Sequence, residues 1–395
     1  MDIKVSHRAQ SIKPSPTLSV TARAAELKAA GKDILSLAAG EPDFDTPDFI
    51  KDAAVKALKD GFTKYTAVDG TPGLKKAIVD KFERENGLRY TPAEVLVSCG
   101  CKHSIYNLFQ ALLNDGDEVI IPAPYWVSYP DMAMLAGAQP AFIKTDIRDQ
   151  FKISPKKLQA AITPKTRLVV VNSPSNPTGV NYTPAELERL GAILLEHPEI
   201  TIASDDIYEH ILWDGTFRNI VNVCPGLKDR TVVLNGVSKA YSMTGWRIGY
   251  AAGPKGLIAA MNKIQSQSTS NPTSIAQAAA QVALEGDQGF VRDQCRVFKE
   301  RHDYVYERLN KMYGVEAIPA QGTFYTFPNM QGVIDRLDGV DNDIQLAEWF
   351  LDQTGCAMVP GSAFGAPGCM RISFATGMKV LADAMTRMEK ALGTK

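Results

Sequence analysis

The stretch TVVLNGVSKAYSMTGWRIGYAAG, residues 231–253, shows the pattern on which the predicted fold rests. An apolar run at Thr231–Asn235 leads into a short polar segment, and a second run follows at Arg247–Gly253. Similar runs occur earlier in the chain, at Val95–Ser98, Val119–Pro122, Leu168–Ser173 and Ile200–Ser204. Continuous apolar strands of this length are typical of a parallel sheet that is buried on both faces.

Helical patterns lie between these runs. Ile105, Leu108, Phe109 and Leu112 follow the i, i+3, i+4, i+7 spacing of one helix face. Thr183-Pro184-Ala185-Glu186 has the residues of a helix N-terminus and precedes a helical pattern at 187–196. The alternation predicts an α/β fold whose mostly parallel central sheet is flanked by helices.

The pattern changes before residue 45 and after about residue 300. Asp303–Tyr313 is helical and charged, and two short strand-like pieces follow at Gly322–Pro328 and Cys369–Ala375. We therefore expect a large domain over residues 46–299. A smaller α/β domain would be built from both chain ends, residues 1–45 and 300–395.

Composition excludes several classes of protein. The 395 residues carry 43 Lys+Arg against 44 Asp+Glu, a net charge of −1, whereas a nucleic-acid binder would carry a basic excess. Neither an apolar leader nor a membrane-spanning run is present, which favours a soluble protein. Six scattered cysteines and five scattered histidines match neither a disulfide framework nor a metal motif. We expect a reduced, cytoplasmic protein without a bound metal.

Two cations follow the strand at 231–235. Lys239 stands just beyond the strand, and Arg247 follows eight positions later. A lysine in this place is commonly an exposed loop residue, but a desolvated lysine amine is also the group that forms Schiff bases with carbonyl compounds. Arg247 would lower the pKa of such an amine or bind a phosphate with two hydrogen bonds.

Polar residues also follow two other strands, and functional groups gather at the carboxyl ends of parallel strands. In ITIASDDIY, residues 200–208, Asp205 stands at the carboxyl end of the strand and is either a helix N-cap or a buried carboxylate that stabilises a positive charge. Asn176 follows in LVVVNSPSNPTG and is either a turn residue or a donor to a ligand oxygen.

The junction VSCGCK at residues 97–102 joins a strand to a helix. It matches neither the dinucleotide-binding nor the Walker motif. The backbone N–H groups of Gly100, Cys101 and Lys102 would face outward from the helix N-terminus, which is a suitable site for one phosphate group. A lysine, a phosphate site, a carboxylate and an asparagine together favour a functional interpretation over the separate structural ones.

Several segments in the same order resemble the class I aminotransferases, which are pyridoxal-phosphate enzymes of fold type I. The segments are SKAYSMTGWRIGY around Lys239, NPTG at 176–179, SDDIYEH at 204–210 and LAAGEPDFDTP at 37–47. KPSPTLSV at 13–20, KYTAVDGTPGL at 64–74 and PYWVSYP at 124–130 are similar to the bacterial aspartate aminotransferases, including those that use prephenate. The resemblance covers essentially the whole chain.

The resemblance implies pyridoxal 5'-phosphate as cofactor and gives roles to individual residues. Lys239 would carry the cofactor and act as the catalytic acid and base, while Asp205 would pair with the pyridine nitrogen. Asn176 and Tyr208 would bind the ring hydroxyl. Trp126 would stack on the ring; a tryptophan without this context is more often a core residue.

The phosphate group would be bound by residues from three segments: Gly100, Cys101, Lys102, Ser238 and Arg247. Relatives usually have Gly or Ser at the position of Cys101, a change that backbone donors tolerate. Tyr65 would reach the phosphate of a neighbouring subunit, which implies a homodimer with shared active sites.

Substrate would contact Lys13, Gly40, Trp126, Asn176 and Arg371. Arg371 matches the arginine that binds the α-carboxylate, with the backbone of Gly40 beside it. Residues 264–291 contain no arginine or lysine, so the partner-subunit arginine of other subgroups is missing. Lys13 would bind the second carboxylate instead; the alternative is an exposed lysine of the N-terminal tail.

These features predict transfer of an amino group between aspartate or glutamate and 2-oxo acids such as 2-oxoglutarate and oxaloacetate, with prephenate as a further acceptor. An aromatic or alanine aminotransferase and a lyase that eliminates from Cβ are alternatives on the same fold. A catalytically silent regulator is a third possibility, but it would not need the lysine, the aspartate and both arginines.

Overall fold

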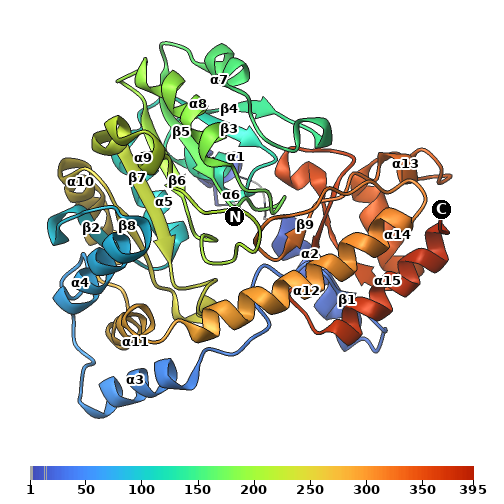
Figure 1. Ribbon diagram of the computed structural model, residues 1–395, viewed down its shortest axis with the longest axis horizontal. Helices are drawn as coiled ribbons and strands as arrows, with labels where there is room; N and C mark the ends of the chain where they lie inside the picture. Colours follow the sequence, from blue (N-terminus) through green and yellow to red (C-terminus); the bar gives the residue numbers. More distant parts are fainter. Residues whose placement is uncertain (1–2, 13, 15) are drawn as a thin grey trace.

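The computed structural model describes residues 3–12, 14 and 16–395 of the chain. Its centre is a seven-stranded sheet in the order β2-β8-β7-β6-β5-β3-β4 (Figure 1). The strands are β2 (Val95–Ser98), β3 (Glu118–Ala123), β4 (Gln139–Lys144), β5 (Thr166–Asn172), β6 (Thr201–Asp205), β7 (Thr231–Gly236) and β8 (Gly249–Ala252).

The sheet confirms the predicted α/β class. Strands β4, β3, β5, β6 and β7 pair in parallel, whereas β8 pairs antiparallel with both β7 and β2. All six apolar runs that predicted strands lie on these strands. Strand β4 has no such run, because it lies at the edge of the sheet and several of its side chains are exposed.

Alternate side chains of each strand enter separate cores on the two faces of the sheet. In β3, Val119 and Ile121 belong to one core and Ile120 to the other. The first core is covered by α5 (Cys101–Leu112), α6 (Ser128–Leu135) and α10 (Lys255–Ser266). The second is covered by α3 (Asp48–Lys59), α4 (Pro72–Lys81), α7 (Pro155–Ala161), α8 (Pro184–Leu195), α9 (Ile220–Val223) and α11 (Ser274–Glu285).

The two helix patterns read from the sequence form as expected. In α5, the apolar face buries Ile105, Leu108 and Phe109. Helix α8 begins after Thr183, whose side chain accepts a hydrogen bond from the Glu186 N–H while the Glu186 side chain accepts from the Thr183 N–H. This reciprocal pair satisfies two backbone donors that helix geometry leaves free.

The two chain ends lie together beside the large sheet. Strand β1 (Leu35–Ser36) pairs in parallel with β10 (Cys356–Ala357), and β11 (Val359–Pro360), β12 (Met370–Ser373) and β9 (Tyr325–Thr326) form an antiparallel sheet. Around them lie α2 (Pro16–Ala29), α13 (Gln331–Ile334), α14 (Asp343–Thr354) and α15 (Met378–Leu392), and α1 (His7–Ser11) lies against α6 (Figure 1).

Helix α12 (Gly289–Lys311) connects the large sheet to this region. In Figure 1 it is the long orange helix that runs from beside α11 to α14 and α15. The predicted domain boundary at 299–300 falls inside this continuous helix, and the division into residues 46–299 and the two ends stays a prediction. Among the described residues, no helix has both the length and the apolar character to cross a membrane.

Candidate active site

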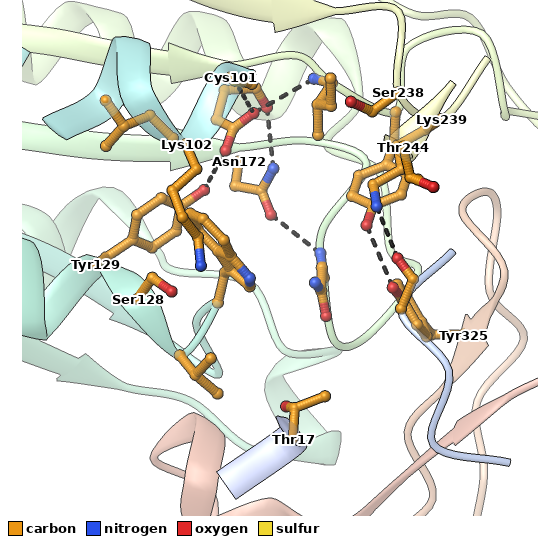
Figure 2. A pocket seen from close by; sticks show the side chains of 18 of the residues that line it. Thr17, Cys101, Lys102, Ser128, Tyr129, Asn172, Ser238, Lys239, Thr244 and Tyr325 are labelled. Atoms are coloured by element: carbon orange, nitrogen blue, oxygen red, sulfur yellow. Dashed lines mark hydrogen bonds between the residues drawn. The ribbon is translucent and has the colours of Figure 1, made fainter. Parts of the chain in front are cut away.

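A cavity of about 270 Å³ lies at the carboxyl ends of the parallel strands. Most of the predicted site residues line it: Gly40, Cys101, Lys102, Trp126, Asn176, Asp205, Tyr208, Ser238, Lys239, Arg247 and Arg371. Figure 2 shows Cys101, Tyr129 and Asn172 on one side of the cavity, with Lys239, Thr244 and Tyr325 on the other. Ligand sites at this edge are the rule for open α/β sheets.

Two predicted residues, Gly100 and Tyr65, do not line this cavity, and a third cannot be placed. Gly100 is the N-cap of α5 and directly precedes Cys101 and Lys102, which do line the cavity. Tyr65 is 91% exposed and belongs to the outer surface of the chain. Lys13 lies outside the described residues, so its role stays a prediction.

Lys239 is half-buried three residues beyond β7. Its Nζ donates a hydrogen bond of 2.6 Å to the carbonyl of Gly40, from the N-terminal segment. Burial, with smaller contributions from the nearby Arg247 and Arg371 and against the effect of Glu41, lowers the pKa of Lys239 to about 8. About a tenth of this amine is therefore neutral, and so nucleophilic, at pH 7, far more than for an ordinary lysine.

Asp205 is the last residue of β6 and is almost fully buried. No helix begins here, so the N-cap alternative does not apply. Tyr129 donates a hydrogen bond of 2.5 Å to its Oδ2, and the Ile207 N–H donates to Oδ1 at 3.3 Å. Burial nevertheless raises the pKa of Asp205 to about 6, because these donors and Lys239 only partly offset the loss of solvation.

Neighbouring strands place Asn172 beside Asp205. The two residues are register partners at the ends of β5 and β6, and Asn172 Nδ2 donates to the Asp205 carbonyl at 2.9 Å. Asn172 Oδ1 accepts from the Asn176 N–H at 3.0 Å, which fixes the loop after β5. The Asn176 side chain thereby reaches the cavity.

Arg371 is a guanidinium buried to 2% exposure on β12. It donates to the carbonyl of Ala38 at 2.9 Å and to Asn176 Oδ1 at 3.2 Å, and it lies over the Tyr325 ring at 4.4 Å. Among the described residues, its Nε has no partner, and the acceptors of its other nitrogens are an amide oxygen and a backbone carbonyl, with no carboxylate. A buried cation in this condition is suited to bind an anionic ligand.

The strand-to-helix junction forms a close-fitting cradle. Gly100 has φ +88°, and a Cβ there would lie 2.3 Å from Arg247 Nη2; a Cβ at Gly249 would lie 2.0 Å from the Cys101 nitrogen. One detail corrects the prediction: the Gly100 N–H is not free, since it donates to the Ser98 carbonyl at 2.7 Å. The N–H groups of Cys101 and Lys102 have no acceptor among the described residues.

The aromatic residues of the cavity are connected. Trp126 packs edge-on against Tyr129, with ring centroids 5.2 Å apart, and Lys102 Nζ lies 4.9 Å from the Trp126 ring. The hydroxyls of Tyr208 and Tyr325 are 3.4 Å apart. Sequence reasoning did not assign Tyr129, Tyr325 or Asn172; Tyr129 does lie inside the segment PYWVSYP that carried the resemblance.

A second group of ionisable residues lies away from the cavity. Glu85, Glu209 and His210 bring possible metal-ligand atoms within 4.8 Å of one another. Buried Lys81 contacts Glu209 and lies 3.5 Å from Glu85, and Asn235 donates to Glu209 at 2.7 Å. Lys81 thus already pairs with both carboxylates, and Arg84 adds a second positive charge beside Glu85.

Comparison with known proteins agrees with this architecture. The family model "Aminotransferase class I and II" matches residues 32–387. The chain is 56% identical to the aspartate/prephenate aminotransferase of Nitrosomonas europaea, covering 99% of this chain and 100% of that one. It is 48% identical to the aspartate aminotransferase of Geobacillus stearothermophilus, covering 98% of each.

Solved structures show the same similarity. The aspartate aminotransferase of Rhizobium meliloti superimposes with a TM-score of 0.96, at 46% identity and 100% coverage of both chains. The Thermus thermophilus aspartate aminotransferase, solved with maleate, gives a TM-score of 0.94 at 42% identity, covering 99% of this chain and 100% of that one. The chain belongs to the class I and II aminotransferase family, as its motifs predicted.

Proposed function

We propose that the protein is a pyridoxal-phosphate-dependent aspartate aminotransferase. It would transfer the amino group between aspartate or glutamate and the 2-oxo acids oxaloacetate and 2-oxoglutarate, with prephenate as a further acceptor. The observation that carries the proposal is one cavity that combines the Lys239 amine, the buried Asp205 carboxyl and the unpaired Arg371 guanidinium. The names of the similar proteins point to the same substrates.

The residues at the junction fit the phosphate of this cofactor. Helix α5 has twelve residues, and its N-terminus presents the N–H groups of Cys101 and Lys102 together with the positive end of the helix dipole. Arg247 is fixed beside them by a hydrogen bond of 2.8 Å from Nη1 to the Thr244 carbonyl. Glycine at position 100 leaves the space that the Arg247 side chain occupies.

Asp205 fits the pyridine nitrogen of the cofactor. A carboxyl whose burial raises its pKa becomes more acidic when a cation is placed beside it, because the ion pair compensates the lost solvation. Asp205 would therefore ionise when it meets a protonated ring nitrogen, and each charge would stabilise the other. Tyr208 and Asn176 would donate to the ring hydroxyl, and Trp126 would stack on the ring.

Pyridoxal phosphate, when bound, supplies an aldehyde that takes up amino groups and a conjugated ring that withdraws electrons from the substrate's α-carbon. Lys239 would hold the cofactor and, once released by the substrate amine, move the proton at the α-carbon. Its lowered pKa suits that work, since an acid-base group is most effective when its pKa lies near the working pH.

Arg371 would bind the α-carboxylate of the substrate. Its buried position excludes water, and its Nε is the unsatisfied donor that a carboxylate would meet. Two parallel hydrogen bonds between guanidinium and carboxylate fix orientation as well as supplying energy. For the second carboxylate of a dicarboxylic substrate we retain Lys13 as the proposed partner.

We also propose a homodimer in the cytoplasm. Phe49, Val55, Leu58 and Phe62 are apolar yet between 38% and 50% exposed, and Tyr65 beside them is 91% exposed. A second copy of the chain covering this surface would bury them and bring Tyr65 to the partner's phosphate site. All six cysteines are free, in keeping with a reducing compartment.

The decisive experiment is trapping of the bound cofactor. The protein is loaded with pyridoxal phosphate, treated with borohydride and digested, and the modified peptide is identified by mass spectrometry. We expect one adduct, on Lys239, and none in Lys239→Ala, whereas the exposed Lys390→Ala should behave as wild type. An adduct on another lysine, or none in the wild type, would refute the proposal.

Half-reaction kinetics then decide the substrate. We expect aspartate and glutamate to transfer their amino group to the cofactor of the loaded protein. We expect oxaloacetate, 2-oxoglutarate and prephenate to accept that amino group and so to restore the starting form of the cofactor. Higher kcat/KM for alanine, or for phenylalanine with phenylpyruvate, would instead support the alanine or aromatic alternative. Release of ammonia without an oxo-acid acceptor would identify a lyase.

A further inference from the structure

Three donors from three elements surround the carboxylate of Asp205. The Tyr129 hydroxyl, from α6, donates to Oδ2 at 2.5 Å, which is the shortest of the three contacts. The Ile207 N–H, from the turn after β6, reaches Oδ1 at 3.3 Å. The Cys101 thiol, from the first turn of α5, lies 3.9 Å from Oδ1 and is a weak donor.

The surroundings of the Tyr129 side chain fix the position of its hydroxyl. The side chain is 2% exposed, and its ring packs edge-on against Trp126, at an interplanar angle of 82°. Burial and the nearby Asp205 carboxylate raise the pKa of Tyr129 well above its usual range. The phenol therefore stays protonated across the physiological range and acts only as a donor toward Asp205.

Without this donor, Asp205 would be a poor partner for a cationic ring. Burial raises the pKa of Asp205 to about 6, and the Tyr129 hydrogen bond is the strongest of the effects that oppose the rise. Loss of the hydroxyl would carry the pKa of Asp205 closer to neutral pH. Four other ionisable side chains interact electrostatically with Asp205: Lys239, Cys101, Tyr208 and Asp206. Of these, only Lys239 carries a positive charge that favours the ionised form of Asp205.

We propose that Tyr129 is a positioning residue, whose hydroxyl orients Asp205 and holds it ionised so that it can keep a pyridine nitrogen protonated. Cys101 supports the same carboxylate as a second and weaker donor. This inference rests on the proposed function, because it assigns Tyr129 to the cofactor ring through Asp205. Tyr129 itself need not touch substrate or cofactor.

Tyr129→Phe removes one oxygen atom and keeps the ring that packs on Trp126. The matched control is Tyr182→Phe, which removes the hydroxyl of another buried tyrosine, one that accepts from the Ile153 N–H at 2.9 Å and does not line the cavity. Because a hydrogen bond to a charged group contributes substantially to the free energy of binding, its loss in Tyr129→Phe should weaken pyridoxal-phosphate binding by about ten- to a hundred-fold. Equilibrium binding to the unloaded proteins measures this, and Tyr182→Phe should bind as wild type.

The visible absorbance of the bound cofactor gives a readout that is independent of turnover. A ring that has lost its positive charge would let the Lys239 nitrogen, when joined to the cofactor, keep its proton to higher pH. We therefore expect the absorbance midpoint to move upward by about one pH unit in Tyr129→Phe and by less in Cys101→Ala. The Cys101 variant keeps the test available if Tyr129→Phe does not fold.

Reconstitution with a cofactor analogue methylated on the pyridine nitrogen tests the cause. With pyridoxal phosphate we expect Tyr129→Phe to have a lower kcat than the wild type. The analogue carries a fixed positive charge, so with it the two values of kcat should agree within about two-fold. Wild-type binding and absorbance in both Tyr129→Phe and Cys101→Ala, or equal effects in Tyr129→Phe and Tyr182→Phe, would overturn the inference. Failure of the wild type to form an adduct at Lys239 would instead overturn the proposed function.

Discussion

At the scale of single residues, the cavity contains ionisable groups that the protein alone does not satisfy. Arg371 is buried without a carboxylate partner in the described part of the chain, and Asp205 is buried with its pKa raised. Lys239 has a lowered pKa for the same reason, burial, acting on a group of opposite charge. Each of these groups would be stabilised by a ligand of the complementary charge, and such a combination favours a binding site over a structural core.

Arg371→Met should remove the binding of the α-carboxylate. Loss of a buried, charge-assisted contact costs about 2–5 kcal/mol, so kcat/KM for aspartate should fall by roughly 30-fold to several thousand-fold. Arg371→Lys, which keeps the charge but loses the two-pronged geometry, should fall less. Steady-state kinetics with aspartate and 2-oxoglutarate measure both variants.

The control for this experiment is Arg230→Met. Arg230 donates to the carbonyls of Leu194, His197 and Ile200, at the other end of the sheet from the cavity. Its removal should lower the free energy of unfolding and leave KM unchanged. Similar KM changes in the Arg230 and Arg371 variants would show that the loss comes from general destabilisation.

Asp205→Asn should make the protein without cofactor more stable, in a pH-dependent manner. The folded pKa of Asp205, about 6, lies above the unfolded value of 3.8, so the folded state binds the extra proton between these values. Stability of the wild type therefore falls as pH rises through this window, and asparagine avoids the loss. Above pH 6 the variant should gain about 2–3 kcal/mol.

Urea unfolding of both proteins between pH 3.5 and pH 8 measures the difference. The gain should be absent at the acid end and complete above pH 6, while affinity for pyridoxal phosphate should decrease throughout. A gain of the same size at every pH would show that the carboxyl charge is not its source.

The sequence predicted residues that have a recognisable context and missed those that have none. Lys239, Asp205 and Asn176 follow apolar runs, which mark strand ends, so their arrival at one edge of the sheet could be foreseen. Tyr325 is a tyrosine in a short strand of the chain ends, and nothing in its neighbours indicates that its ring lies over Arg371. Such contacts depend on how distant segments pack.

At the scale of elements, apolar runs located the strands but not every direction or end. Strand β8 runs antiparallel, which a short buried run cannot indicate. Edge strand β4 was not predicted, since exposure of its side chains removes the apolar signal and Pro140 weakens the strand pattern. The hydrogen bond that occupies the Gly100 N–H could not be read from sequence either, because it depends on the local turn.

The junction between β2 and α5 provides a prediction at this scale. Gly100→Ala places a Cβ 2.3 Å from Arg247 Nη2 at a φ of +88°, which L-residues rarely adopt. Displacing Arg247 should weaken pyridoxal-phosphate binding by about ten-fold or more, besides a conformational cost of about 1–2 kcal/mol. Fluorescence titration with the cofactor and thermal unfolding measure the two effects.

Gly31→Ala is the matched control for Gly100→Ala. Gly31 also has positive φ, +81°, but nothing lies within 4 Å of its added Cβ. It should therefore lose stability to a similar degree and bind the cofactor as wild type. Unchanged cofactor affinity in Gly100→Ala would show that the junction does not hold the phosphate.

At the scale of the whole molecule, segments far apart in sequence complete one site. Residues near the N-terminus provide the Gly40 carbonyl that holds Lys239, and β12 near the C-terminus provides Arg371. Arg301 of α12 is joined to Asp43 by two hydrogen bonds, of 2.6 and 3.0 Å, which ties the N-terminal segment to the long helix.

The proposed sharing of active sites between two subunits can be tested by mixing two defective variants. Lys239→Ala damages the site of its own chain, whereas Tyr65→Ala, at a residue 91% exposed in the isolated chain, would damage only the partner's site. In a mixed dimer, one site then receives both substitutions and the other receives neither. After unfolding and refolding together in equal amounts, half of the dimers are mixed, so activity should return to about a quarter of the wild-type value.

The measurement is specific activity at limiting pyridoxal phosphate, where loss of a phosphate contact has its largest effect. Each variant refolded alone should have an activity well below a quarter of the wild-type value. A mixture of Lys239→Ala with Lys390→Ala serves as the control, because Tyr65 is intact in both of its chains. Activity of the first mixture equal to the average of the two variants alone would mean that Tyr65 serves its own chain or no site at all. The exposed aromatic side chain would then belong to the dimer surface without completing the partner's cavity.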